Sequence, residues 1–142
     1  MNNNVLDKDI TDFNRHIKFL SRVYITKNKN TFNEEKTVRD SKRLDMLISS
    51  YPTVVFEYMG PVLVKYANLI NDEKWDELME QDFNDEKSQV EENYREELDS
   101  CIIFVKQLYN LCTTKEKEKI GESIQNMLSS YCQYVINTRK TQ

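Results

Sequence analysis

The sequence predicts an all-α protein, a compact bundle of five or six helices that ends in a long antiparallel helical hairpin. Apolar residues recur along most of the chain at alternating spacings of three and four, which places them on one side of a helix. The 142 residues include only two glycines and two prolines, whereas sheets joined by tight turns usually need more of both. This length fits one domain, so we expect a polar tail over residues 1–9 and a single helical domain over residues 10–142.

The first half of the chain divides into helices separated by polar or proline-containing segments. The apolar stripe over residues 10–24 predicts the first helix, and a second helix is expected to begin near Asn33. Pro52 restarts the chain after that helix, because proline fits the first turn of a helix but not its interior. For the same reason we expect Gly60-Pro61 to end a short apolar helix and to open another. A further short helix is expected around Trp75.

The last part of the chain predicts the hairpin. A helix is expected over residues 85–112, and a final helix follows it with the same spacing of apolar residues. Thr113 and Glu116 match a capping box, in which each side chain accepts a hydrogen bond from the other residue's backbone N–H. Because the link between the two helices is short, we expect them to lie antiparallel. The side chains expected to be buried in this seam are Leu98, Val105, Leu108, Ile124 and Met127.

The composition narrows the class of protein. The three cysteines, Cys101, Cys112 and Cys132, are odd in number and lack paired metal-type spacing, so we expect reduced thiols in an intracellular protein that is not secreted. No apolar run is long enough to predict a membrane span. The absence of a glycine-rich loop argues against P-loop and dinucleotide-binding folds. The heavy use of Asn, Lys, Ile and Tyr resembles that of proteins from AT-rich genomes, including those of large DNA viruses.

Candidate catalytic groups are few. His16 is the only histidine and lies just off the apolar stripe of the first helix, so we expect it at the surface or at the boundary of the core. Cys101 and Cys112 fall on the apolar seam, where burial raises a thiol pKa and makes the group unreactive, and Cys132, next to Tyr131, is also expected to pack in the core. The sequence therefore favours a protein without a catalytic site, metal or cofactor.

Charge is unevenly distributed along the chain. Residues 71–99 hold 13 acidic and three basic side chains, whereas the segments on either side each carry a small positive excess. This pattern is explained either by two opposite patches that steer a charged partner or by solvated helix faces that partly neutralise each other. The net charge of −4 argues against nucleic-acid binding as the main role.

One pattern within the acidic segment is typical of an enzyme family. The spacing of Asp76, Glu77 and Glu80, followed by Glu96 and Asp99, resembles the paired acidic motifs of the all-α nucleoside-triphosphate pyrophosphatases, the MazG-like and dimeric dUTPase-like families. The resemblance implies that these five carboxylates hold Mg²⁺ that contacts the substrate phosphates. On helix geometry, however, both acidic sets point away from the apolar faces, so in a simple hairpin they would face water rather than each other.

The final helix carries the expected contact surface. Residues 123–138 contain no charged side chain, and such a segment is either buried on several sides within a bundle or lies against another chain. We predict that it contributes to an interface through Ser130 and Gln133, with Tyr131 or Tyr134 as anchors.

The expected function is a non-enzymatic structural or adaptor role through helix-mediated protein–protein contacts, as in a small component of a large assembly such as a virus particle. The partner would be another protein or further copies of this chain, with no membrane and no nucleic acid. Two alternatives remain: a Mg²⁺-dependent all-α nucleoside-triphosphate pyrophosphatase, and a small helical regulator of a charged partner.

Overall fold

The computed structural model describes residues 3–83 and 92–140, with the side chains of residues 8–83, 95–96 and 99–139. The predicted all-α class is confirmed, because these residues form helices joined by turns and contain no strand. The described part has seven helices, against the five or six predicted. They are α1 (Asn3–Lys27), α2 (Glu34–Ser50), α3 (Val54–Lys65), α4 (Ala67–Asn71), α5 (Trp75–Glu80), α7 (Glu92–Leu111) and α8 (Thr114–Lys140).

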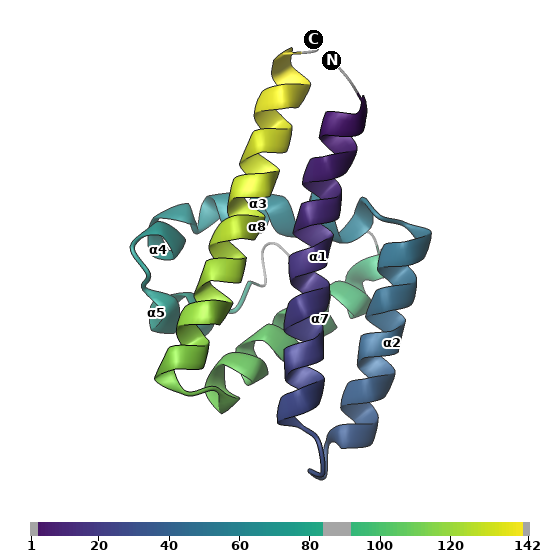
Figure 1. Cartoon of the computed structure of the whole chain (residues 1–142), viewed down its shortest axis with the longest axis vertical. Helices are drawn as coiled ribbons and strands as arrows, with labels where there is room; N and C mark the ends of the chain where they lie inside the picture. The colour runs from purple at the N-terminus through teal and green to yellow at the C-terminus, as the bar shows by residue number, and fades with distance from the viewer. Residues whose placement is uncertain (1–2, 84–91, 141–142) are drawn as a thin grey trace.

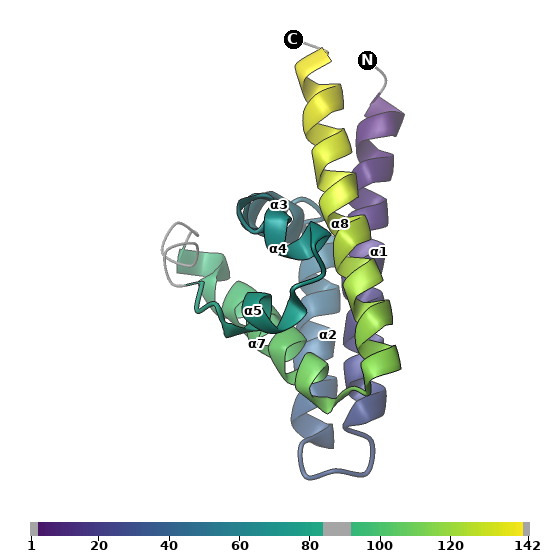
Figure 2. The ribbon, with the colours of Figure 1, turned by 90° about the vertical axis from the view of Figure 1, so that its left-hand side faces the viewer.

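Helices α1 and α8 lie side by side and antiparallel, and they form the long axis of the molecule (Figures 1 and 2). Helix α2 packs along the second half of α1. Helix α3 crosses α8 and α1 near their middle, and α4 and α5 continue from its far end beside α8. Helix α7 runs diagonally across the same side as α3 and contacts α1 and α2. The first and last helices therefore form the scaffold on which the other helices pack.

Polar contacts mark both ends of the α1–α8 pair. At one end Asn137 Nδ2 donates to Asp9 Oδ2 at 3.4 Å, and both side chains are buried. At the other end Lys27 Nζ lies 2.5 Å from Glu116 Oε2. Helix α1 begins at Asn3 and Asp9 is buried, so the first helix starts earlier than the expected start near residue 10.

The predicted hairpin between α7 and α8 is not confirmed. Only Cys112 and Thr113 join the two helices, yet α7 points away from α8 at a wide angle while α8 follows α1 (Figure 2). The apolar spacing of α8 identified a buried helix correctly but did not identify its neighbour. The predicted capping box is present: Thr113 N donates to Glu116 Oε1 at 2.9 Å, and Glu116 N donates to Thr113 Oγ1 at 3.3 Å.

The predicted break at Gly60-Pro61 is also wrong, because α3 continues through both residues. Proline removes the hydrogen bond to the carbonyl one turn earlier, that of Glu57. Both Pro61 and Glu57 are exposed, so this carbonyl lies on the solvent side of the helix, where water can satisfy it. The expected helical state of the apolar segment before Gly60 is confirmed, since α3 begins at Val54.

A single cluster of buried side chains draws on all seven described helices. Of the predicted seam, Leu108, Ile124 and Met127 are buried and Val105 is half-buried, while the side chain of Leu98 lies outside the described residues. No single helix in the described ranges is both long and apolar enough to cross a membrane. The largest fully buried side chains are Phe13, Phe56, Ile17, Leu20, Ile70, Leu108, Ile120 and Val55.

Candidate functional site

The two tyrosines predicted as interface anchors pack inside the fold. The ring centroid of Phe56 lies 5.1 Å from that of Tyr131 and 4.8 Å from that of Tyr134, so both tyrosines cover α3. Gly60 makes room for this contact, because an ideal Cβ there would lie 2.6 Å from Tyr131 Cγ. Burial raises the pKa of Tyr131. Both rings are half-buried, so their main contacts are within the fold rather than with a partner.

The polar side chains of the charge-free segment divide between the interior and the surface. Ser123 and Asn137 are buried, and Ser130, which was predicted at the interface, is half-buried. Gln125 is also half-buried and donates to the carbonyl of Ile70 in α4 at 3.1 Å. Much of the missing charge in α8 is therefore explained by its position between α1 on one side and α3 and α4 on the other.

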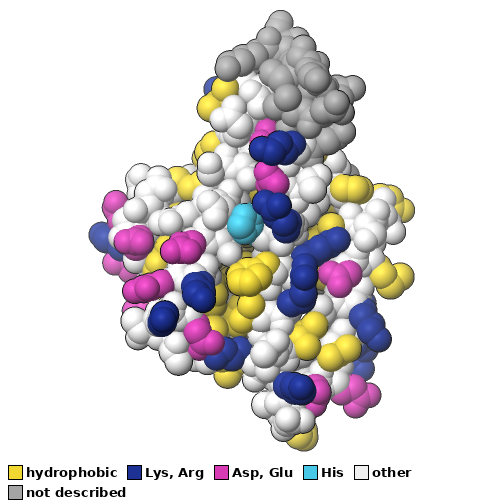
Figure 3. All heavy atoms as spheres, viewed as in Figure 1, with side chains coloured by type: hydrophobic (Ala, Val, Ile, Leu, Met, Phe, Trp, Pro, Cys, Tyr) yellow, Lys and Arg dark blue, Asp and Glu magenta, His cyan; other side chains and the backbone are white. Residues whose placement is uncertain are grey.

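A narrower uncharged face remains exposed. We define the outer strip as Asn126, Ser129, Gln133 and Ile136 of α8 together with Phe19 of α1, all of which are exposed. Ile136 retains 47% of its surface and Phe19 retains 41%, which is high for large apolar side chains. Figure 3 shows hydrophobic side chains directly below the single histidine, on the face formed by α8 and α1.

Histidine does not add charge to this face. His16 lies one turn before Phe19 on α1 and is half-buried, as the sequence predicted. Burial lowers its pKa, and the neighbouring Arg15 lowers it further while Asp12 opposes the shift. The imidazole is therefore neutral near pH 7 and adds no charge beside the outer strip.

Basic side chains border the outer strip. Figure 3 shows lysine and arginine side chains gathered over α1 and α2 on the same face of the molecule. Arg15 pairs with Asp12 at 3.1 Å on α1. Lys18 and Arg22 of the same helix are in no ion pair with any of the described residues. Their charge therefore remains available on this face.

The five acidic residues of the pyrophosphatase-like pattern do not converge. Asp76 Oδ1 accepts a hydrogen bond of 2.6 Å from the hydroxyl of Tyr109, near the end of α7. Glu96 Oε1 lies 3.4 Å from Arg43 Nη2 of α2, near the start of α7. Because Tyr109 and Glu96 are thirteen residues apart on one helix, these two contacts are separated by about 20 Å along it.

The remaining members of the pattern are similarly placed. Glu77 and Glu80 are exposed on α5, and Asp99 is half-buried on α7. No group of three or more His, Cys, Asp or Glu side chains within the described ranges is arranged to hold a metal ion. Burial and the bond to Asp76 instead raise the pKa of Tyr109 to about 12, which indicates a structural contact between α5 and α7.

The cysteines are free thiols in three different settings. Cys101 and Cys112 are buried as predicted, and burial raises the pKa of Cys101 to about 12 and raises that of Cys112 as well. Cys132, expected in the core beside Tyr131, is exposed. The reason is its position on α8, since the ring of Tyr131 turns to α3 and leaves the next residue at the surface.

Comparison with known proteins adds no assignment. No protein-family model matches the chain, and neither a curated protein nor a solved structure is significantly similar to it.

Proposed function

We propose that this chain is a non-enzymatic structural or adaptor protein that acts through helix-mediated contact with another protein chain, and that the outer strip lies at that contact. The observation that supports this most is the outer strip itself, whose uncharged side chains include two exposed large apolar ones, Phe19 and Ile136. Nothing within the described fold covers either of them well.

The chemistry of the outer strip suits burial against a partner. Asn126, Ser129 and Gln133 are neutral, so their desolvation costs far less than that of Lys or Glu. Phe19 supplies an aromatic side chain of the kind that often contributes most to binding at the centre of an interface. In this proposal the aromatic anchor is Phe19 rather than Tyr131 or Tyr134, while Ser130 and Gln133 stay within or beside the contact.

The basic border suggests the chemistry of the partner. Arg22 is exposed and Lys18 is half-buried on the same helix as Phe19, and neither pairs with an acidic side chain among the described residues. A partner surface with an apolar centre and an acidic rim would complement this arrangement, and rim charges mainly raise the rate of association. The proposed partner is therefore a protein whose apolar patch is bordered by acidic side chains, and no charge needs to be buried in the contact.

The test is the mass in solution of the wild-type chain and of two variants. The first variant is the double substitution Ser129→Glu with Gln133→Glu, which would strand two carboxylates in a closed interface. The second is Phe19→Ala. Light scattering after gel filtration is measured over a wide concentration range, with the chain alone and with extract of the cells that make it. We expect the wild type to form a complex and both variants to lose it.

A matched control changes the same chemistry elsewhere. Asn68→Glu with Asn71→Glu places two carboxylates on exposed positions of α4, away from the outer strip, and should leave the complex intact. Circular dichroism confirms that each variant folds. The proposal fails if the wild type stays monomeric under all these conditions, or if the outer-strip variants assemble as the wild type does.

A further inference from the structure

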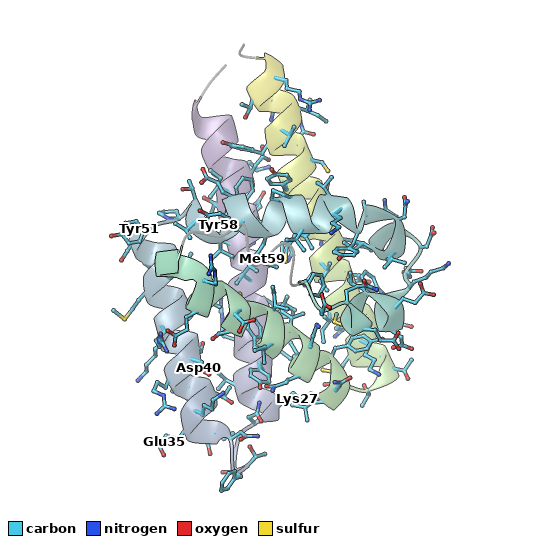
Figure 4. All side chains as sticks on the ribbon, turned by 180° about the vertical axis from the view of Figure 1, so that it is seen from behind. Lys27, Glu35, Asp40, Tyr51, Tyr58 and Met59 are labelled. Carbon is cyan, nitrogen blue, oxygen red and sulfur yellow. The ribbon has the colours of Figure 1, made fainter. Side chains whose placement is uncertain are left out.

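A partly open cavity of about 140 Å³ lies where α2 meets α1 and α7. In Figure 4, which shows the molecule from behind, it lies between α2, on which Asp40 is labelled, and the diagonal α7. Three small polar side chains contribute to its floor, Ser21 of α1 with Thr37 and Ser41 of α2, and all three are buried. Helix junctions are usually filled by larger apolar side chains, so these residues leave the space.

The floor offers hydrogen bonds that the fold does not use. Ser21 Oγ and Ser41 Oγ lie 2.6 Å apart, and one hydroxyl donates to the other. Each hydroxyl has one proton and two lone pairs, so this bond uses only one of the two protons. Within the described structure neither hydroxyl has another partner. Thr37 is different, because its hydroxyl donates to the carbonyl of Asn33 at 2.8 Å.

The walls of the cavity include apolar and aromatic side chains as well as the charged side chains of Lys36, Asp40 and Arg43. Leu44 of α2 and Ile103 and Phe104 of α7 line it, and the ring of Phe104 lies 5.7 Å from that of Tyr24. Aromatic walls favour a flat ring in offset or edge-to-face contact. An engineered cavity of about 150 Å³ in another protein binds benzene, so a single six-membered ring matches the space here.

We propose that this cavity binds a phenol-like group, that is, one aromatic ring with a hydroxyl. The ring lies against Phe104 and Leu44, and the hydroxyl exchanges hydrogen bonds with the Ser21–Ser41 pair. Such a group comes either from a free small phenol or from a tyrosine side chain that another protein presents. The site is formed by α1, α2 and α7 and includes no residue of the outer strip, so it goes beyond the proposed function.

A second cavity in the same molecule provides an internal comparison. It has a volume of about 60 Å³, lies between α3 and α7, and is lined by apolar side chains that include Met59, Leu63 and Met127 (Figure 4). It is too small for a benzene-sized ring without rearrangement and offers no hydroxyl pair. Binding that depends on a hydroxyl should therefore be confined to the larger cavity.

The experiment is a titration of the whole chain with p-cresol and with toluene, which differ by one hydroxyl, followed by methyl NMR. We expect p-cresol to shift the signals of Leu44 and Ile103 saturably, with a Kd of about 1 mM or tighter. Toluene should bind about tenfold more weakly, because it leaves the serine pair without the new hydrogen bond. The signals of Met59 and Leu63 should move little.

A third ligand distinguishes the two sources of the phenol. N-acetyltyrosinamide carries the same ring on a peptide backbone that must remain outside the cavity. Binding as strong as that of p-cresol means that the opening admits a tyrosine presented by another protein. Binding only of p-cresol means that the natural ligand is a free small phenol. Either result supports the site, and each identifies one source.

Two variants and a control test whether p-cresol binds at the serine side chains of the cavity floor. Ser41→Ala removes one hydroxyl without adding bulk and should reduce p-cresol binding about tenfold, to the level of toluene. Ser21→Leu should fill the space and abolish both. Ser49→Ala, at an exposed position of α2, should bind as the wild type does.

The wild-type comparison alone can overturn the proposal, even if a variant does not fold. It is wrong if p-cresol gives no saturable shifts, as expected of a cavity that holds only water. It is also wrong if p-cresol and toluene bind equally, or if the shifts are centred on Met59 and Leu63.

Discussion

The ring of Tyr131 occupies the space that a side chain at Gly60 would need, and this pair sets how closely α8 approaches α3. An ideal Cβ at Gly60 would lie 2.6 Å from Tyr131 Cγ, the atom next to the stem of that side chain. The stem cannot swing away as a flexible side-chain end can, so relief would require a shift of a helix or a new rotamer. The contact also explains why a glycine is compatible with the middle of α3.

Gly60→Ala should lower the free energy of unfolding by about 1–3 kcal/mol, because overpacking outweighs the gain of about 1 kcal/mol that alanine normally brings to a helix. Chemical denaturation measures the change. In a Tyr131→Ala background the penalty should shrink or reverse, since the ring is gone. An alanine variant more stable than the wild type would show that α8 does not approach α3 so closely.

Leu108→Ala should cost about 2–5 kcal/mol of stability, because removal of its fully buried side chain would leave a cavity in the core. Leu111→Ala is the matched control on the same helix, and should cost under about 1 kcal/mol since Leu111 keeps 49% of its surface exposed. Equal losses at the two positions, measured by urea unfolding, would contradict the orientation of α7.

Acid should weaken the contact between Lys27 and Glu116 over a defined range of pH. Hydrogen bonds from Lys27 and from the backbone N–H of Thr113 lower the pKa of Glu116 from 4.5 to about 2. A depressed acid pKa stabilises the fold fully above pH 4.5, and this contribution is lost as the pH falls towards 2.

The comparison is between the wild type and Glu116→Gln, whose stabilities should converge between pH 4.5 and 2 in denaturation experiments. Glu118→Gln changes an exposed glutamate of the same helix and serves as the control. If the wild type and Glu116→Gln differ by the same amount at pH 7 and pH 2.5, the lowered pKa of Glu116 is wrong.

Mg²⁺ should neither raise the thermal unfolding temperature nor support release of pyrophosphate from common nucleoside triphosphates. The physical reason is the separation of about 20 Å between the contacts of Asp76 and Glu96 along α7. Differential scanning fluorimetry and a pyrophosphate assay test this. Turnover that disappears in Glu80→Gln or Asp99→Asn would instead establish the enzymatic alternative.

Local patterns in the sequence predicted local structure well. The capping box at Thr113 and Glu116 was correct because both partners lie within one helical turn, where sequence spacing determines geometry. Burial of Leu108, Ile124 and Met127 followed from the same kind of spacing. The break expected at Gly60-Pro61 was wrong. Proline leaves the carbonyl of Glu57 without its helical hydrogen bond, but that carbonyl lies on the solvent side of α3, where water can satisfy it.

Pairing between distant helices could not be predicted in the same way. The apolar spacing of α8 fits any neighbour, so the short link to α7 suggested a hairpin, whereas α1 became the partner. The pairing of α8 with α1 also changes which of its residues are exposed. Tyr131 and Tyr134, predicted as interface anchors, face α3, and a narrower part of α8 remains exposed. Phe19 joins that face from α1, and only the tertiary arrangement brings it beside α8.

The hydrogen bond between Asp9 and Asn137 joins residues that are 128 positions apart in the chain. During synthesis α1 leaves the ribosome well before its principal partner α8, so the side of α1 that packs on α8 stays uncovered until α8 has been made. Helical proteins usually fold rapidly because their contacts are local, but this bundle has to close its longest loop to form its central pair. During synthesis α1 therefore exposes apolar surface for longer than a helix that pairs with its neighbour in the sequence.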